Sequence, residues 1–192
     1  KDVIGKKEKK AQPAKSEPVK VAEHPLARVD LRVGKIIAVE RHPAADRLFV
    51  ETVDFGEPSG PRTVVSGLVE HVPIEDLQDR LCMFVCNLKP ASLCKVMSTA
   101  MLLVSKDAAG LEPLIVPEGS QPGDLVSVDG LLPQPDPVIK PKEDTWEKVR
   151  VDLKTIEGIA YYQDKPLVVI DKDGQPRLGH VTSVKAPTGE IS

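Results

Sequence analysis

The apolar residues of this chain come in short runs, and none of them reaches the ~18–20 residues that a membrane-spanning helix needs. Turn-forming residues separate these runs, with 18 prolines and 13 glycines among the 192 residues. Short apolar or alternating runs bounded by proline and glycine are typical of β-strands joined by turns. We therefore expect a mainly β protein without a membrane span.

Seven short strands are expected in the first two thirds of the chain, at residues 31–39, 48–53, 62–66, 81–88, 100–105, 111–116 and 124–128. Residues 73–78 are expected to form a short helix, because proline opens this segment and acidic residues follow it. One helix between the third and fourth of several short strands favours a five-stranded OB-fold barrel. An SH3-like barrel or a small sandwich would satisfy the strand count alone.

Four prolines between residues 133 and 141 separate a C-terminal part from this barrel. Its expected elements are a helix over 143–150 and strands over 159–162 and 166–170. About 60 residues are marginal for independent folding. We therefore expect an OB-fold barrel over residues 27–130, with a small α+β module over residues 131–192 packed on it.

Residues 1–26 are expected to form a basic, flexible linker. Residues 1–24 hold seven lysines and four acidic residues, and they have too few apolar side chains to fold alone. Such an arm can gather RNA without sequence preference. The whole chain nevertheless has a formal net charge of −3, which is unfavourable for binding nucleic acid.

The three cysteines lack C-x-x-C spacing, which indicates a reducing compartment, and we expect the cytoplasm. The polar first 20 residues have no apolar segment of the kind found in signal peptides. The four histidines are scattered along the chain, whereas metal ligands need close, converging spacing. We expect neither a metal nor a cofactor.

The polar connection between the expected strands at 81–88 and 100–105 holds the most informative side chains. It carries Asn87, Lys89 and Ser98 and ends at Met101. These residues supply amide, ammonium and hydroxyl groups, which bind phosphates and base edges. They include no pair of nucleophile and base, so the connection indicates binding and not catalysis.

Five motifs in this order resemble the tRNA-binding domain of the endothelial monocyte-activating polypeptide II type. They are LRVGKII at 31–37, RTVVSGLV at 62–69, NLKPA at 87–91, SxAM at 98–101 and PEGSxPG at 117–123. Such domains end the multisynthetase scaffold protein and some tyrosyl- and methionyl-tRNA synthetases, and they also occur in bacterial tRNA-binding proteins. The resemblance is strong over residues 27–130 and weaker over residues 131–192.

The resemblance implies a non-catalytic module that binds tRNA with little sequence preference and supports a synthetase in cis or in trans. It also implies a monomer, because the C-terminal module of such proteins mimics the dimer interface of bacterial relatives. The tRNA-binding residues that it implies are Lys35, Arg62, Asn87, Lys89, Lys95, Ser98 and Met101.

The chain departs from the family pattern after Ala91. Many members have Lys-Met-Arg-Gly there, whereas this chain has Ser92, Leu93, Cys94 and Lys95. Two cations are thus replaced by Ser92 and Cys94, which should weaken tRNA binding and flatten its salt dependence. Lys95 restores one cation nearby.

Each candidate in the polar connection also has a purely structural interpretation. Asn87 can satisfy a turn, and Ser98 can bond to nearby backbone. Met101 can fill the core, and Lys89 can be an ordinary solvated charge.

The two candidates outside the connection have structural alternatives as well. Arg62 can pair with an acid such as Glu51, and Lys35 can protect an edge strand from aggregation.

Two alternative functions belong to other classes. The acidic total charge is compatible with a protein–protein adaptor. Residues 32–37 resemble a segment associated with cytokine activity in released fragments of the family, which suggests a signalling role.

Overall fold

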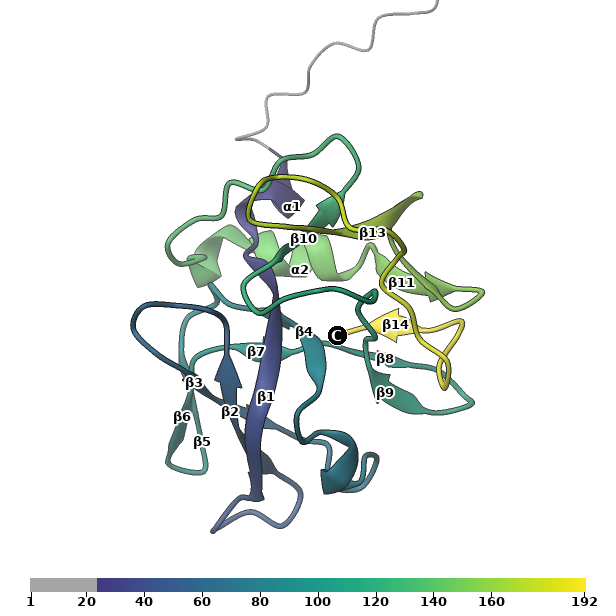
Figure 1. Cartoon of the computed structure of the whole chain (residues 1–192). Helices are drawn as coiled ribbons and strands as arrows, with labels where there is room; N and C mark the ends of the chain where they lie inside the picture. Colours follow the sequence, from purple (N-terminus) through teal and green to yellow (C-terminus); the bar gives the residue numbers. More distant parts are fainter. Residues whose placement is uncertain (1–23) are drawn as a thin grey trace, which may run out of the picture.

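The computed structural model describes residues 24–192, and within them the chain forms 14 β-strands and two short α-helices (Figure 1). The expectation of a mainly β protein is confirmed. The expected linker lies almost entirely outside the described residues, and its last two positions belong to helix α1 (Pro25–Arg28). Neither α-helix in the described part of the chain is long and apolar enough to cross a membrane.

The elements of residues 31–128 follow the expected strands with local differences. They are β1 (Leu31–Arg41), β2 (Phe49–Asp54), β3 (Arg62–Ser66), the 3-10 helix η2 (Ile74–Asp76), β4 (Leu81–Val85), β5 (Ala91–Leu93), β6 (Val96–Ser98), β7 (Met101–Leu102), β8 (Val104–Lys106), β9 (Leu111–Pro113) and β10 (Leu125–Val128). The expected helix over 73–78 is only the single turn η2, and the chain turns at Asp79, which has a φ of 60°. The expected strand over 100–105 is divided into β7 and β8.

Strand β1 is the centre of this part of the fold. It pairs antiparallel with β2, β4 and β10. A β-carbon at Gly34 would lie 2.5 Å from Cε1 of Phe55, so glycine is needed there for close packing. The register between β1 and β2 shifts between Ile36 and Ala38.

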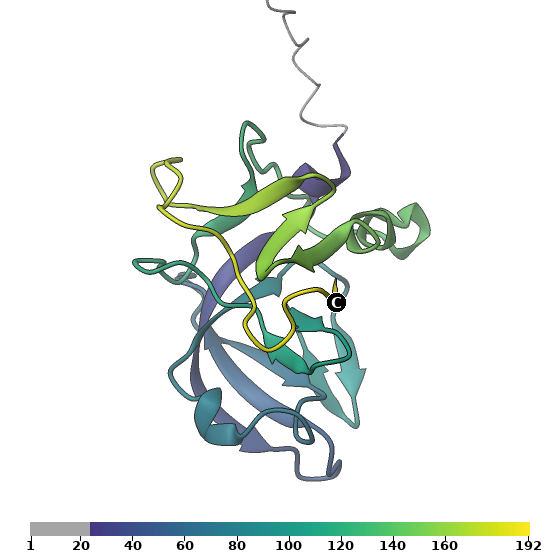
Figure 2. The same ribbon diagram turned by 90° about the vertical axis from the view of Figure 1, so that its right-hand side faces the viewer.

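The C-terminal part continues the same sheet. Its elements are the 3-10 helix η3 (Pro141–Glu143), α2 (Thr145–Arg150), β11 (Leu153–Ile156), β12 (Ile159–Tyr162), β13 (Lys165–Ile170) and β14 (Glu190–Ile191). Strand β13 pairs with β10, and β14 pairs with β8. Figure 2 shows the green and yellow C-terminal strands lying over one end of the blue and teal strands.

One hydrophobic core joins the two parts. It contains Val33 and Met83 from the N-terminal strands together with Trp146, Leu153 and Leu167 from the C-terminal part. A second cluster fills the other end of the N-terminal strands, where the Phe55 and Phe84 rings meet edge to face at 5.1 Å. The C-terminal residues therefore pack on the N-terminal strands as expected, whereas the finer OB-fold assignment stays a prediction.

Candidate nucleic-acid interface

The connection between β4 and β7 folds into a β-hairpin that the sequence did not predict. Strands β5 and β6 pair only with each other and form a separate two-stranded sheet. The two residues of the turn, Cys94 and Lys95, have φ values of 48° and 73°. Residues with positive φ fit a tight hairpin turn, but the usual Asn or Gly signal is missing here.

Asn87 joins the start of this connection to two distant segments, residues 28–30 and Asp136. Its side chain is buried, and its Oδ1 accepts a hydrogen bond from the backbone N–H of Asp30 at 2.9 Å. Its amide nitrogen donates to the backbone carbonyls of Arg28 and Asp136, each at 2.9 Å. Both amide hydrogens are therefore used inside the protein, and the structure corrects the expectation that Asn87 faces RNA.

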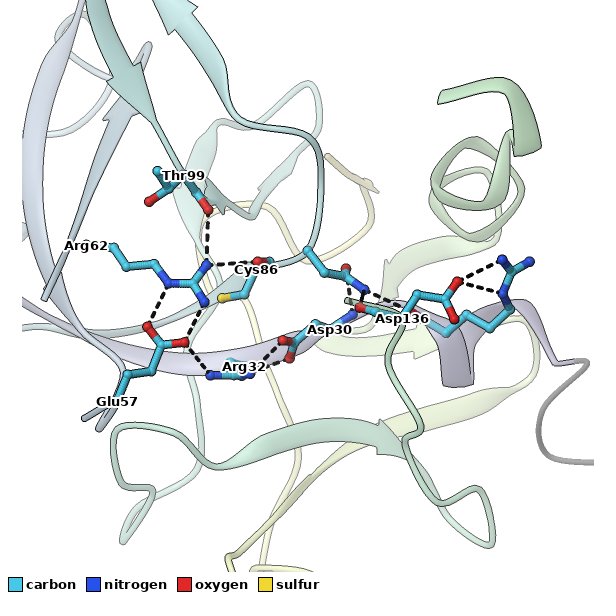
Figure 3. Close-up of polar contacts among 9 residues, drawn as sticks. Asp30, Arg32, Glu57, Arg62, Cys86, Thr99 and Asp136 are labelled. Atoms are coloured by element: carbon cyan, nitrogen blue, oxygen red, sulfur yellow. Dashed lines mark hydrogen bonds and ion pairs between the residues drawn. The ribbon is translucent and has the colours of Figure 1, made fainter. Parts of the chain in front are cut away.

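Arg62 joins the two ends of the connection. Its guanidinium donates to the backbone carbonyl oxygens of Cys86 at 2.8 Å and Thr99 at 3.2 Å. It forms an ion pair with Glu57 (Figure 3), and it lies over the Phe55 ring at 5.5 Å from the centroid. The hydrogen bond from Arg62 lowers the pKa of Glu57. The cation is thus paired with Glu57 and not with Glu51, which favours the structural interpretation, and its contact with tRNA stays a prediction.

The ion pair of Arg62 belongs to a longer chain of charges along the foot of the hairpin. Glu57 also pairs with Arg32 at 2.9 Å, and Arg32 pairs with Asp30 at 2.7 Å. Figure 3 shows this row of ion pairs, which runs from Arg62 to Asp30. Asp30 is buried and the other three side chains are partly buried, so the charges hold one another in place beneath the hairpin.

Ser98 is also a structural residue. It is buried, and its hydroxyl oxygen accepts a hydrogen bond from the backbone N–H of Val65 while the hydroxyl donates to the carbonyl of Ala100, both at 2.9 Å. These bonds fix the end of β6 against β3. Ser98 lines the groove described next, but its polar atoms are already bonded, contrary to the sequence expectation.

The remaining candidates offer free groups to solvent. Lys89 and Lys95 are exposed, and Met101 is partly buried against the first core. Lys89, Ser98 and Met101 line one groove of about 140 Å³ at the foot of the hairpin. Its other lining residues are mainly aliphatic: Val65, Leu88, Ala91, Leu93, Thr99 and Ala100.

Lys35 lies apart from this groove. It is partly exposed on β1, between Asp54 of β2 and Leu81 of β4. It is therefore on a central strand, and the structural alternative of an edge-strand charge is wrong.

Lys89 and Lys95 are both exposed; Lys89 lines the aliphatic groove, and Lys95 lies in the turn of the hairpin. Cations beside an aliphatic groove suit phosphates and the flat faces of bases or riboses.

Two exposed apolar residues of the hairpin were missed in the sequence. Leu93 is 38% exposed and Met97 is 52% exposed, so the hairpin presents aliphatic surface as well as charge. A signal was available, because Leu93 precedes the two turn residues and Val96 and Met97 follow them. Within residues 24–192, no group of His, Cys, Asp or Glu side chains is arranged to hold a metal ion.

Comparisons with known proteins agree with this description. The family model described as "Putative tRNA binding domain" matches residues 31–125. Aminoacyl tRNA synthase complex-interacting multifunctional protein 1 of Cricetulus griseus is 44% identical over 84% of this chain and 44% of its own length. Cytoplasmic methionine–tRNA ligase of Caenorhabditis elegans is 46% identical over 75% of this chain and 16% of its own length. The chain thus spans less than half the length of these relatives.

A solved structure has the same fold. The C-terminal domain of Plasmodium vivax p43 matches with a TM-score of 0.74 and 25% identity, over 87% of this chain and 98% of that one. The match includes most of the C-terminal part, which lies beyond the family model. Through residues 31–125, the chain belongs to the family of tRNA-binding domains.

Proposed function

We propose that this chain binds tRNA through the β5–β6 hairpin and the groove at its foot, without catalysing a reaction. The family match supports this proposal. The observation that carries it is the pairing of exposed Lys89 and Lys95 with an aliphatic groove on a hairpin that stands outside the main sheet. Lysines contact phosphates as point charges, and the groove accepts an unstacked base or a ribose.

The network beneath the hairpin gives the interface its shape. Asn87, Arg62 and Ser98 use their polar groups to fix the ends of the connection. A surface that is already ordered loses less conformational entropy when it binds. These three residues therefore support tRNA binding indirectly, while Lys89, Lys95 and Met101 are the proposed contacts.

We assign Lys35 a smaller part, as a peripheral cation. It lies outside the groove residues, so it would contact only a tRNA that extends over β1. Contacts to phosphates give little sequence preference, so we expect different tRNAs to bind with similar affinity.

The proposed role is to raise the local concentration of tRNA at an aminoacyl-tRNA synthetase. The relatives include a synthetase and a protein named for its interaction with the synthase complex. A binding module tethered to a catalytic domain raises the effective concentration of its ligand there. We propose that the synthetase is attached in cis or docked in trans, and that the protein acts in the cytoplasm.

We further propose that the module acts as a monomer. The C-terminal part extends the sheet from β10 and β8 and shares the first core with the N-terminal strands. These strands are thereby covered within one chain. Sedimentation equilibrium at micromolar concentration should give a mass near 20.8 kDa for this chain.

Titration of bulk tRNA at two salt concentrations tests the main proposal. We expect saturable binding at ~50 mM salt and a steep loss of affinity at ~200 mM, because binding releases counterions. A protein–protein adaptor would show no saturable binding at the lower salt concentration.

Replacement of Lys89 provides the residue-level test. Lys89→Ala should weaken all tRNAs to a similar extent and reduce the salt slope by about 1, as expected for one lost phosphate contact. Lys154→Ala is the matched control, because Lys154 is an exposed lysine on β11 of the C-terminal part. Equal effects of the two substitutions would contradict the proposed location of the interface.

A further inference from the structure

The β5–β6 hairpin is held to the protein mainly at its foot. Ser98 and Thr99 bond to β3 there, with the N–H of Thr99 donating to the carbonyl of Thr63 at 3.0 Å. Residues 91–95 are all exposed, and β5 and β6 pair as strands only with each other. The turn of a hairpin attached in this way would be mobile without a further contact to the rest of the protein.

His42 makes the contact that reaches the tip. It follows β1 directly, and its side chain is buried. Its Nε2 lies 3.1 Å from the carbonyl oxygen of Leu93, the last residue of β5. Among the hydrogen bonds of residues 24–192, this is the only one that joins residues 91–97 to a residue outside the hairpin of residues 91–98.

The hydrogen bond at Nδ1 of His42 determines that Nε2 carries the hydrogen. The backbone N–H of Ala44 donates to Nδ1 of His42 at 3.0 Å, so Nδ1 carries no hydrogen. In a neutral imidazole the hydrogen is then on Nε2. Nε2 therefore donates to the Leu93 carbonyl. The His42 ring thus connects the turn after β1 to the hairpin.

We propose that His42 is a positioning residue for tRNA binding, an inference that rests on the function proposed above. By holding Leu93, it fixes the turn that carries Lys95 relative to Lys89 and the groove. An interface whose two cations keep a constant separation binds with a smaller entropy loss than one with a mobile tip. His42 acts through the hairpin and has no contact with RNA in this scheme.

Two substitutions separate this role from stabilisation of the turn. In His42→Asn, the side-chain oxygen replaces Nδ1 and can still accept from Ala44, but it does not reach Leu93. In His42→Gln, the amide nitrogen replaces Nε2 and can still donate to Leu93. We expect His42→Asn to weaken tRNA binding about three- to tenfold, the range of one lost hydrogen bond. His42→Gln should stay within about twofold of the unsubstituted protein.

Hydrogen exchange and a double-mutant cycle complete the test. Backbone amides in residues 91–97 should exchange faster in His42→Asn and at the original rate in His42→Gln. Lys95→Ala should cost less affinity in the His42→Asn background than alone, since the two residues act together. The inference is overturned if His42→Asn binds and exchanges like the unsubstituted protein, if His42→Gln is as weak as His42→Asn, or if the effects of Lys95 and His42 add.

Binding of tRNA to the unsubstituted protein distinguishes a failure of the proposed function from a failure of the positioning role of His42. If it binds no tRNA at ~50 mM salt, the proposed function fails and the positioning role fails with it. If it binds tRNA and His42→Asn binds equally well, only the positioning role is refuted.

Discussion

Glu51 should make this protein less stable as the pH rises from 5 to 8. It lies on β2 with its side chain fully buried in the second core region. One carboxylate oxygen accepts a hydrogen bond from the Ser66 hydroxyl, and the other has no partner among residues 24–192. Burial raises the pKa of Glu51 to about 7, although the bond from Ser66 opposes this shift.

The sign and size of the effect follow from this pKa. The pKa of an ordinary Glu, and of Glu51 in the unfolded chain, is near 4.5. The pKa of Glu51 is higher in the folded state than in the unfolded chain. The contribution of Glu51 to stability is therefore fully present below about pH 4.5 and is lost as the pH rises through about 7. One pKa unit corresponds to ~1.4 kcal/mol. The free energy of unfolding should therefore fall by about 2–3 kcal/mol between pH 5 and pH 8 from this group alone.

Urea unfolding of Glu51→Gln at the two pH values measures this contribution. Glutamine has nearly the same shape and does not ionise, so its variant should lose about 2–3 kcal/mol less than the unsubstituted protein between pH 5 and pH 8. Glu118→Gln is the matched control, because Glu118 is exposed and its replacement should leave the pH profile unchanged. Parallel pH profiles for Glu51→Gln and the unsubstituted protein would refute the reasoning.

Two further predictions concern the hairpin and the core. Ser92→Lys combined with Cys94→Arg adds two cations at exposed positions beside Lys95; tRNA titrations should show tighter binding and a salt slope steeper by up to about 2, and an unchanged slope would place the hairpin outside the interface. Gly34→Ala puts a β-carbon 2.5 Å from the Phe55 ring and should cost about 1–3 kcal/mol in urea unfolding. The control Gly67→Ala, whose nearest contact would be at 3.9 Å, should change stability little, and equal losses would contradict the packing argument.

Strands with a clear local pattern were predictable to the residue. The expected ranges 62–66 and 159–162 are those of β3 and β12, because alternation and flanking turn residues are local properties. The same pattern already places Glu51 on the buried face of β2, between Phe49 and Val53. Pairing of Glu51 with Arg62 was therefore a poor expectation even from the sequence.

The β5–β6 hairpin was not predictable in this way. Its turn residues, Cys94 and Lys95, are not the residues that usually adopt positive φ. The family pattern has glycine at the position of Lys95. This sequence therefore lacks the residue that would have indicated the turn, and only the structure shows where the turn lies. The bond of His42 to Leu93 joins residues 51 positions apart, so no local pattern indicates it.

The sequence by itself determined the mainly β architecture, most strand positions and the family, because each depends on local pattern or on motifs in order. Only the tertiary structure decided which polar side chains remain free. Asn87 bonds to Asp30 and Asp136, which lie 57 and 49 positions away, whereas Lys89, two residues later, is exposed. An amide suits a ligand and a distant backbone equally well, so its role is fixed by the segments that the fold brings beside it.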